Sequence, residues 1–388
     1  MRLKGGSKQM KRIMTITFLN NFVSGALTLL IPLLLLDNGV DLAQIGLVLS
    51  VLPIVFLVVR LLLAAFADRA GWSHIFLLVN WPANVFSTII YYFAVSLPGF
   101  LAGKVMEGFR DASYWAVNRT AIFNLAPNHR EREATRNNAV IWLATAVGSA
   151  AAGLGIAYLG FSPTILFLML TSLAIGIPAS MLWSVGRRNP KPGAKPVLTL
   201  LSPRGRGRIF WWVSIALMFN GLATYPLVTL LLPAFMDQQM GYSYSTIGLL
   251  FMLYNVIASA TTVITLKTPL TVRRAVIQSV IALVASVFLA VSGMLFPAFF
   301  FALAFVRGFS VAFFEYNVAK VVKNSKNVSA DIGWLHVPMR LSEFLSVLIA
   351  GYLTQTLGYA PVFAATGVFF VVFSLMSLKV LGNESPQL

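Results

Sequence analysis

The chain has 388 residues, of which 58% are hydrophobic and 11% are charged, with 29 Lys and Arg against 12 Asp and Glu. A soluble domain is roughly 45–50% apolar and about 25% charged, so this composition indicates a polytopic membrane protein. The lack of cysteine excludes disulfide frameworks, thiolate metal sites and cysteine nucleophiles. The three histidines (His74, His129 and His336) have no metal-binding spacing, so we expect neither a metal nor a cofactor.

Twelve apolar segments are long enough to cross a bilayer as helices, at about 20 residues each. In chain order they are residues 13–36, 43–67, 74–97, 99–125, 135–159, 162–184, 208–236, 243–266, 273–295, 297–322, 330–357 and 360–381. The predicted fold is therefore an all-α polytopic membrane protein with twelve transmembrane helices.

The basic residues are placed on one side of these predicted spans. Six of the 29 lie well inside spans, and the other 23 fall in the termini, loops and span ends that share one side. Because basic loops stay in the cytoplasm, this bias predicts cytoplasmic termini and a multi-pass protein of the cell membrane. The net charge of +17 is thus a topology signal, and we expect no nucleic-acid partner.

Residues 185–207 are rich in proline, glycine and basic side chains, which is typical of a linker. They divide the chain into an N-terminal half at 1–184 and a C-terminal half at 208–388. Short motifs return about 200 residues later: Ile45-Gly46-Leu47 as Ile247-Gly248-Leu249, Gly153 with Gly160 and Pro163 as Gly351 with Gly358 and Pro361, and Glu107-Gly108-Phe109 as Arg307-Gly308-Phe309. Two parallel six-helix halves are one known architecture of secondary transporters.

The fourth predicted span contains an unusual run of charges between Lys104 and Asn118. A charge at the centre of a spanning helix costs roughly 2.5–3.5 kcal/mol, so the four within this run would cost about 10–14 kcal/mol before pairing. At about 100° per residue, Lys104, Glu107 and Asp111 share one helix face. That face must meet protein or a water-filled cavity, because lipid cannot solvate it.

The chain resembles the major facilitator superfamily of secondary transporters in its span count, its central linker and its half-repeat. After the second span this family has the motif G-x-L-A-D-R-x-G-R-K, and residues 64–73 here read AAFADRAGWS. Ala67, Asp68, Arg69 and Gly71 match the motif, whereas Trp-Ser replaces its basic pair. The resemblance implies that Asp68, with Arg69 and Gly71, is a conformational latch between the halves.

In the fourth span, Lys104, Glu107 and Gly108 stand where the family often has arginine, glutamine and glycine. Either Glu107 or Asp111 could carry a proton during transport, and the alternative is a static ion-pair cluster with Lys104 and Arg110. The counterpart charges in the second half are Arg307, Glu315, Arg340 and Glu343.

In this family, polar and aromatic residues on the first, fourth, seventh and tenth spans would line a central cavity. The candidates here are Asn20, Asn21, Tyr114, Trp115, Asn118, Asn220, Tyr225, Tyr316 and Asn317. An asparagine in a membrane can instead bond a neighbouring helix, at about 0.6 kcal/mol. Asn80 and Asn84 are interpreted as packing contacts.

The sequence therefore predicts a secondary active transporter that moves a small organic solute by alternating access and is coupled to protons. A facilitative uniporter, or a multidrug or metabolite efflux carrier with structural carboxylates, is the alternative. An enzyme is not expected, because no Ser/His/Asp or metal grouping is present. The expected partners are a small-molecule substrate, protons and the lipid bilayer, and we expect a monomer.

Overall fold

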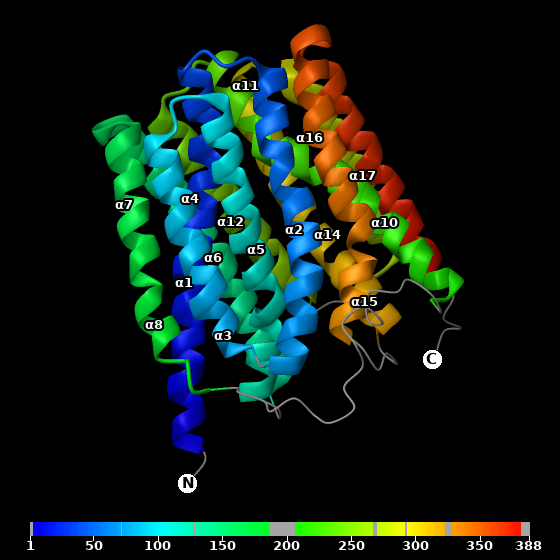
Figure 1. Ribbon diagram of the computed structural model, residues 1–388. Coiled ribbons are helices and arrows are strands. Elements are labelled where there is room, and N and C mark those ends of the chain that lie inside the picture. The colour runs from blue at the N-terminus through cyan, green and yellow to red at the C-terminus, as the bar shows by residue number, and fades with distance from the viewer. Residues whose placement is uncertain are drawn as a thin grey trace. The chain divides into compact units, whose positions relative to one another are not determined.

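The computed structural model describes residues 3–70, 72–126, 129–185, 206–266, 270–291, 293–322 and 328–381, which form helices and short connections without any strand (Figure 1). Most of the predicted linker, residues 186–205, lies outside the described residues. The predicted all-α polytopic fold is confirmed for the part of the chain that is described.

The first six predicted spans correspond to α1 (Leu3–Asp37), α2 (Leu42–Ala70), α3 (Ser73–Ile75) continued by η1 (Phe76–Asn80) and α4 (Trp81–Phe93), α5 (Leu97–Leu125), α6 (Arg130–Leu159), and α7 (Phe161–Ala174) with α8 (Gly176–Ser180). The second six correspond to α10 (Arg208–Pro226) with η2 (Leu227–Leu231) and α11 (Leu232–Gln238), α12 (Tyr244–Leu266), α13 (Val272–Phe288) with η3 (Leu289–Val291) and η4 (Gly293–Leu295), α14 (Phe296–Val322), α15 (Val328–Leu335) with α16 (Val337–Leu357), and α17 (Tyr359–Leu381).

Eleven helices in the described ranges are long and apolar enough to cross a membrane. The predicted span that is missing from this set is α5, which is 29 residues long and therefore long enough to cross. Its charged residues from Lys104 to Asp111 and Arg119 are what separate it from the others. The exceptional span is thus the one that carries the charge cluster.

Among the described residues, two spans contain a wide π-helical turn, and each such turn ends just before an X-Pro pair. The segment Phe76–Asn80 precedes Trp81-Pro82, and Leu227–Leu231 precedes Leu232-Pro233. In both, the next backbone N–H bonds five residues back, from Trp81 to the Phe76 carbonyl and from Leu232 to the Leu227 carbonyl. Proline lacks an N–H and crowds the carbonyl four residues earlier, and the wider turn accommodates both effects.

The chain forms two compact units. Unit 1 comprises Met1–Ile31, Val51–Ser202 and Tyr244–Met252, and unit 2 comprises Pro32–Ser50, Pro203–Ser243 and Leu253–Leu388. Each unit therefore contains most of one predicted half and a short segment from the other. In each unit, glycines allow the segment from the other half to pack closely against its neighbour.

In unit 1, a Cβ atom built on Gly153 would lie 2.6 Å from the Gly248 Cα atom. In unit 2, a Cβ atom built on Gly46 would lie 3.2 Å from the Gly351 Cα atom. Both contacts join the repeated glycines of the sequence, α6 with α12 and α2 with α16, and only glycine permits so close a backbone approach.

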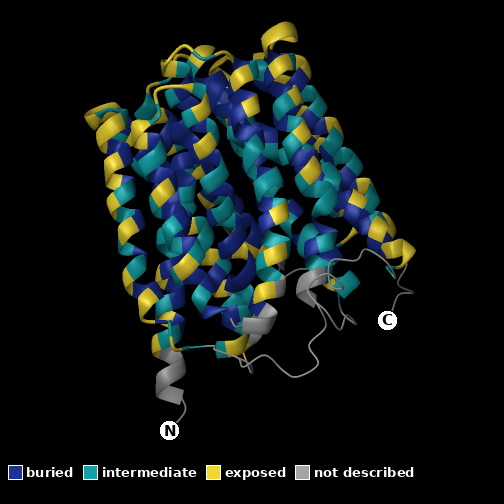
Figure 2. Ribbon diagram, in the orientation of Figure 1, coloured by how far each residue is buried: buried dark blue, intermediate teal, exposed yellow. Residues whose placement is uncertain are grey.

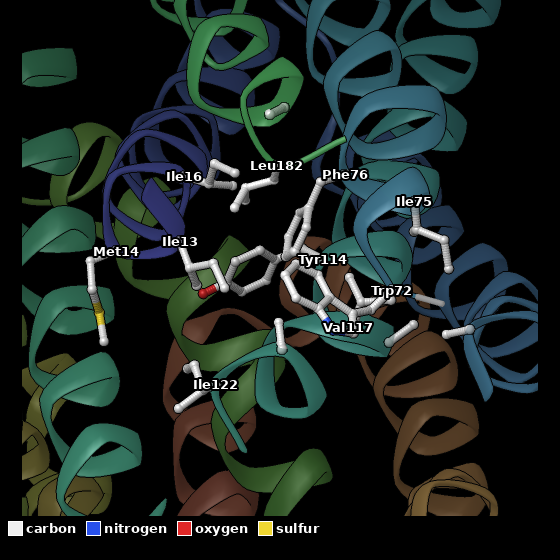
Figure 3. Close-up of a cluster of buried hydrophobic side chains, with 14 of the residues drawn as sticks. Ile13, Met14, Ile16, Trp72, Ile75, Phe76, Tyr114, Val117, Ile122 and Leu182 are labelled. Atoms are coloured by element: carbon white, nitrogen blue, oxygen red, sulfur yellow. The ribbon is translucent and has the colours of Figure 1, made fainter. Parts of the chain in front are cut away.

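Unit 1 contains a hydrophobic cluster in which α1, α3, η1, α5 and α8 meet (Figure 3). Ile13, Phe76, Tyr114 and Leu182 contribute fully buried side chains to it. Unit 2 has a comparable cluster built around Phe313 of α14 and Phe373 of α17. By contrast, Figure 2 shows exposed residues along the outside of the helices, α7 among them. These exposed residues are largely apolar, as a surface in contact with lipid requires.

Small residues let α1 and α6 cross closely within unit 1. A Cβ atom built on Gly148 would lie 2.1 Å from the Phe22 carbonyl oxygen, and one built on Gly25 would lie 2.5 Å from the Thr145 carbonyl oxygen. The Ser149 hydroxyl donates to the Gly25 carbonyl at 3.3 Å. Close backbone packing of this kind is what drives helix association where water cannot.

Candidate functional site

The charged run lies on α5, which begins after Ser96 with Pro98 in its first turn, where the missing N–H of proline costs nothing. Gly108 lets α5 approach α2, because a Cβ atom there would lie 2.6 Å from the Val55 Cβ atom. Its repeat partner Gly308 does the same in unit 2, where a Cβ atom would lie 2.4 Å from the Ala258 carbonyl oxygen. The repeated Gly-Phe motif thus fixes a helix crossing beside a charged residue in each unit.

Glu107 is the centre of a buried ion cluster in unit 1. Its Oε2 atom accepts hydrogen bonds from the Lys104 ammonium and, at 2.5 Å, from the Tyr91 hydroxyl of α4. Its Oε1 atom accepts from Arg110 Nη2 at 3.1 Å. The side chains of Lys104, Glu107 and Arg110 are only 4%, 1% and 1% exposed. A carboxylate held by three donors, two of them cations, is a fixed counter-ion without direct access to water.

Asp111 has a different environment from Glu107. Its Oδ1 atom accepts from Arg110 Nε at 2.8 Å, and its side chain is 19% exposed. Arg110 therefore lies between the two carboxylates, and its Nη2 atom also donates to the Ser24 hydroxyl of α1 at 3.2 Å. The four charges balance, two cations against two anions. Within this cluster, Asp111 is the carboxylate with a partly exposed side chain.

Gly103 leaves room for the Tyr91 ring to pack against the cluster. A Cβ atom on Gly103 would lie 2.2 Å from the Tyr91 ring, and the Lys104 ammonium lies 5.8 Å from the centre of the same ring. The ring and its hydroxyl thus cover two members of the cluster, Lys104 and Glu107.

We expect Tyr91→Phe to lower the free energy of unfolding by about 1.5–3 kcal/mol, the usual worth of a hydrogen bond to a charged group. The substitution preserves the ring packing against Gly103 and removes only the hydroxyl. Unfolding in mixed detergent micelles, followed by tryptophan fluorescence, measures the loss. Tyr158→Phe is the matched control, because Tyr158 is 79% exposed, and equal losses in both variants would contradict the role assigned to the Tyr91 hydroxyl.

A layer of asparagines connects α1, η1 and α4 to α5. The Asn20 side-chain oxygen accepts from both Asn80 and Asn84, each at 3.1 Å. Asn80 also donates to the Arg110 carbonyl at 3.0 Å and to Ser113 at 3.3 Å. The packing role predicted for Asn80 and Asn84 agrees with this geometry, in which Asn20 is part of the same buried group.

A second buried polar group surrounds Thr17 of α1. The Thr17 hydroxyl accepts from Tyr114 at 3.2 Å and from Asn118 at 3.0 Å, and it donates to Asn137 of α6 at 2.9 Å. Asn137 in turn donates to Asn118 at 2.9 Å, and Asn21 donates to the Thr17 carbonyl at 2.7 Å. These contacts join three helices of unit 1, so Asn21, Tyr114 and Asn118 are engaged with protein.

Trp115 differs from the other cavity candidates on α5, since it is 38% exposed. It lies one turn beyond Asp111 on the same face of the helix, and its ring packs edge-on against Tyr114 with 5.3 Å between centroids. Asp111 and Trp115 together thus form the accessible face of the middle of α5.

The counterpart residues in unit 2 are more dispersed than the cluster on α5. Arg307 of α14 lies 5.6 Å from the centre of the Tyr254 ring of α12. Arg340 and Glu343 of α16 pair at 2.6 Å, with Glu343 3% exposed. Of the remaining candidates, Asn317 donates to Ser377 at 2.9 Å, Asn220 is buried, and Tyr225, Glu315 and Tyr316 are of intermediate exposure.

The predicted latch lies outside what the structure describes at the level of side chains. Asp68 and Arg69 belong to α2 without described side chains, and Gly71 is not among the described residues. Their role stays a prediction.

Sequence reasoning missed Tyr91, Ser24, Thr17 and Asn137, each of which contacts a charged or polar residue of α5. Nothing in their local sequence distinguishes them, because their partners lie far away along the chain. A signal was available only for Tyr91, since a glycine next to Lys104 in a spanning helix indicates that something large packs there.

The described helices and the charge cluster within unit 1 define a polytopic all-α membrane protein with ionised groups at membrane depth. The sequence matches the family model of the Major Facilitator Superfamily over residues 13–322, and the chain belongs to this superfamily of membrane transporters.

Solved structures agree with this assignment at the level of fold. A bacterial homolog to the human lysosomal transporter Spinster, in an inward-facing and occupied conformation, matches with a TM-score of 0.75 and 15% identity over 98% of each chain. The human organic anion transporter MFSD10 (TETRAN) matches with a TM-score of 0.64 and 17% identity, over 95% of this chain and 99% of that one. A search of curated proteins found no match.

Proposed function

We propose that this chain is a secondary active transporter that carries a small organic solute across the cell membrane by alternating access and is driven by protons. The observation that supports proton coupling is the unequal environment of two carboxylates one turn apart. Glu107 is buried among three donors, whereas Asp111 is partly exposed and has one cationic partner. Asp111 is therefore the group that exchanges a proton with water, and Glu107 holds Lys104 and Arg110 in place.

The proposed topology, the bilayer as partner and the monomeric state are supported by the distribution of basic residues and by the length and apolar surface of the helices. Basic residues concentrated on one side of the spans support cytoplasmic termini. The apolar exterior of the described helices requires the bilayer as a partner, and a monomer would already contain both six-helix halves.

The test is proteoliposome transport of whichever solute raises the melting temperature of the purified protein in a metabolite and drug screen at two pH values. A carrier that couples one proton to one solute can support about tenfold accumulation for each pH unit, because one unit is about 1.36 kcal/mol. We expect Asp111→Asn to abolish this accumulation and to preserve counterflow, since the site can still change its orientation without releasing a proton.

Two results would contradict proton coupling through Asp111. If Asp111→Asn accumulates solute like the parent protein, another group carries the proton. If the parent protein equilibrates solute and never accumulates it, the alternative of a facilitative carrier with structural carboxylates is correct. Glu133→Gln is the matched control, because Glu133 pairs at 3.8 Å with Arg136, which is 62% exposed.

A further inference from the structure

Arg110 has a hydrogen-bond donor that the protein leaves unused. Its Nε atom donates to Asp111, and its Nη2 atom donates to Glu107 and Ser24, but its Nη1 atom is buried without a partner. The whole side chain is 1% exposed. A buried donor without an acceptor destabilises the protein, so this arrangement points to an acceptor that is supplied from outside.

The charge balance of the cluster determines which acceptor fits. Lys104 and Arg110 are matched by Glu107 and Asp111, so the cluster is neutral while both carboxylates are ionised. A proton on Asp111 would leave one excess positive charge beside a buried guanidinium, where water screens it poorly. An anion would restore neutrality, whereas an organic cation would raise the imbalance.

We infer that Arg110 binds the carboxylate of an anionic solute, and that it does so together with a proton on Asp111. The inference rests on the proposed function and names its substrate class. When Asp111 takes up a proton from water, its carboxylate becomes neutral. The ionic bond between Asp111 and Arg110 Nε is then weaker. The guanidinium then offers Nη1, its donor without a partner, to the solute carboxylate as a charge-assisted hydrogen bond.

The accessible face of α5 provides both the route and a contact for the rest of the solute. Asp111 is a partly exposed side chain in direct contact with Arg110, so the guanidinium lies one side chain behind that surface. Trp115, one turn along the same face, is 38% exposed and offers an aromatic surface for an apolar body. An aromatic carboxylate is therefore a suitable probe.

The neighbouring helices add few groups that could supply this charge or proton. Besides the members of the cluster on α5, the described titratable side chains on the packed elements include Arg60 from α2, His74 from α3, Tyr91 from α4 and Glu133 from α6. The uncharged polar side chains include Thr17, Asn20, Asn21 and Ser24 from α1, Asn80 from η1, Asn84 from α4 and Asn137 from α6. Arg60 lies 5.4 Å from the centre of the Phe56 ring, and His74 packs on Trp183 with 4.5 Å between centroids. Asp111 pairs with Arg110 of the same helix, at 2.8 Å.

The test compares three probes of similar size and different charge, benzoate, benzylamine and benzyl alcohol, by their effect on the melting temperature of the purified full chain. We expect benzoate alone to stabilise the protein, and its half-saturating concentration to rise about tenfold for each pH unit over which Asp111 loses its proton. Inorganic phosphate is a fourth probe, and stabilisation by phosphate in place of benzoate would overturn the assignment to a carboxylate.

Two variants separate recognition from folding. Asp111→Asn mimics the protonated acid, so benzoate should bind it equally well at both ends of the pH range. Arg110→Lys keeps the positive charge but loses Nη1 and the planar donors, and we expect at least about tenfold weaker benzoate binding. Lys379→Gln is the control for a general loss of charge, because the Lys379 ammonium belongs to unit 2 and lies 4.2 Å from the centre of the Trp212 ring.

The outcomes distinguish this inference from the proposed function. Stabilisation by benzylamine, or benzoate binding that keeps its pH dependence in Asp111→Asn, would overturn the inference even if Arg110→Lys failed to fold. Loss of proton-driven accumulation in Asp111→Asn without any benzoate binding would leave the proposed function intact and refute the anion site. Proton-linked benzoate binding in a protein that never accumulates solute would support the anion site and refute proton-driven transport.

Discussion

Glu107→Gln is expected to lower the free energy of unfolding by about 3–5 kcal/mol, the usual result of removing one partner from a buried ion pair. The carboxylate accepts from Lys104, Tyr91 and Arg110. Without its charge, Lys104 and Arg110 would remain as two buried cations with one anion, Asp111, which contacts Arg110. The loss should appear as a lower midpoint in detergent-mixture unfolding and as reduced yield of folded protein.

A double variant separates charge imbalance from lost packing. In Lys104→Met with Glu107→Gln, the cluster returns to one cation and one anion, Arg110 with Asp111, and we expect a large part of the loss to be recovered. The control is again Glu133→Gln, whose 3.8 Å contact with the 62% exposed side chain of Arg136 is worth about 0–1 kcal/mol. If Glu107→Gln were as stable as this control, Glu107 could not be the fixed counter-ion described above.

Gly148→Ala should be the second most damaging change, with a net loss of about 2 kcal/mol or more. In an open helix this substitution would instead gain up to about 1 kcal/mol from helix propensity. At Gly148 the new Cβ atom would lie 2.1 Å from the Phe22 carbonyl oxygen. Backbone cannot rotate away as a side chain can, so α1 and α6 must separate.

The measurement is the same unfolding midpoint, compared with Gly207→Ala. Gly207 has a φ of −74° and no neighbouring atom within 4 Å of a built Cβ, so alanine is tolerated there. A midpoint for Gly148→Ala that equals or exceeds that of Gly207→Ala would show that the α1–α6 crossing is looser than the structure indicates.

Much of the fold could be predicted because lipid makes the sequence signal strong. A spanning helix must be apolar over about 20 residues, which is why the twelve predicted segments correspond to helices in the described residues. The irregular turns at Phe76–Asn80 and Leu227–Leu231 were not predicted. Hydropathy does not depend on backbone geometry, so it cannot reveal these turns. The prolines that cause them, Pro82 and Pro233, are nevertheless visible in the sequence.

The candidate site could be predicted along one helix but not across helices. Helical periodicity places Lys104, Glu107 and Asp111 together, since they are three or four residues apart. It assigns no partner to Arg110, which the structure places between both carboxylates. Residues such as Asn20 and Asn118 form hydrogen bonds with asparagines from distant segments, and no local sequence pattern predicts those contacts.

The wide turn at Phe76–Asn80 also determines the angular position of everything that follows it in the third span. One additional residue in a helical turn rotates the rest of the helix by about 100°. Asn84, which bonds Asn20, and Tyr91, which bonds Glu107, both lie beyond that turn. Deletion of a single residue from this segment would turn both side chains away from their partners. This stretch should therefore tolerate substitutions far more readily than insertions or deletions.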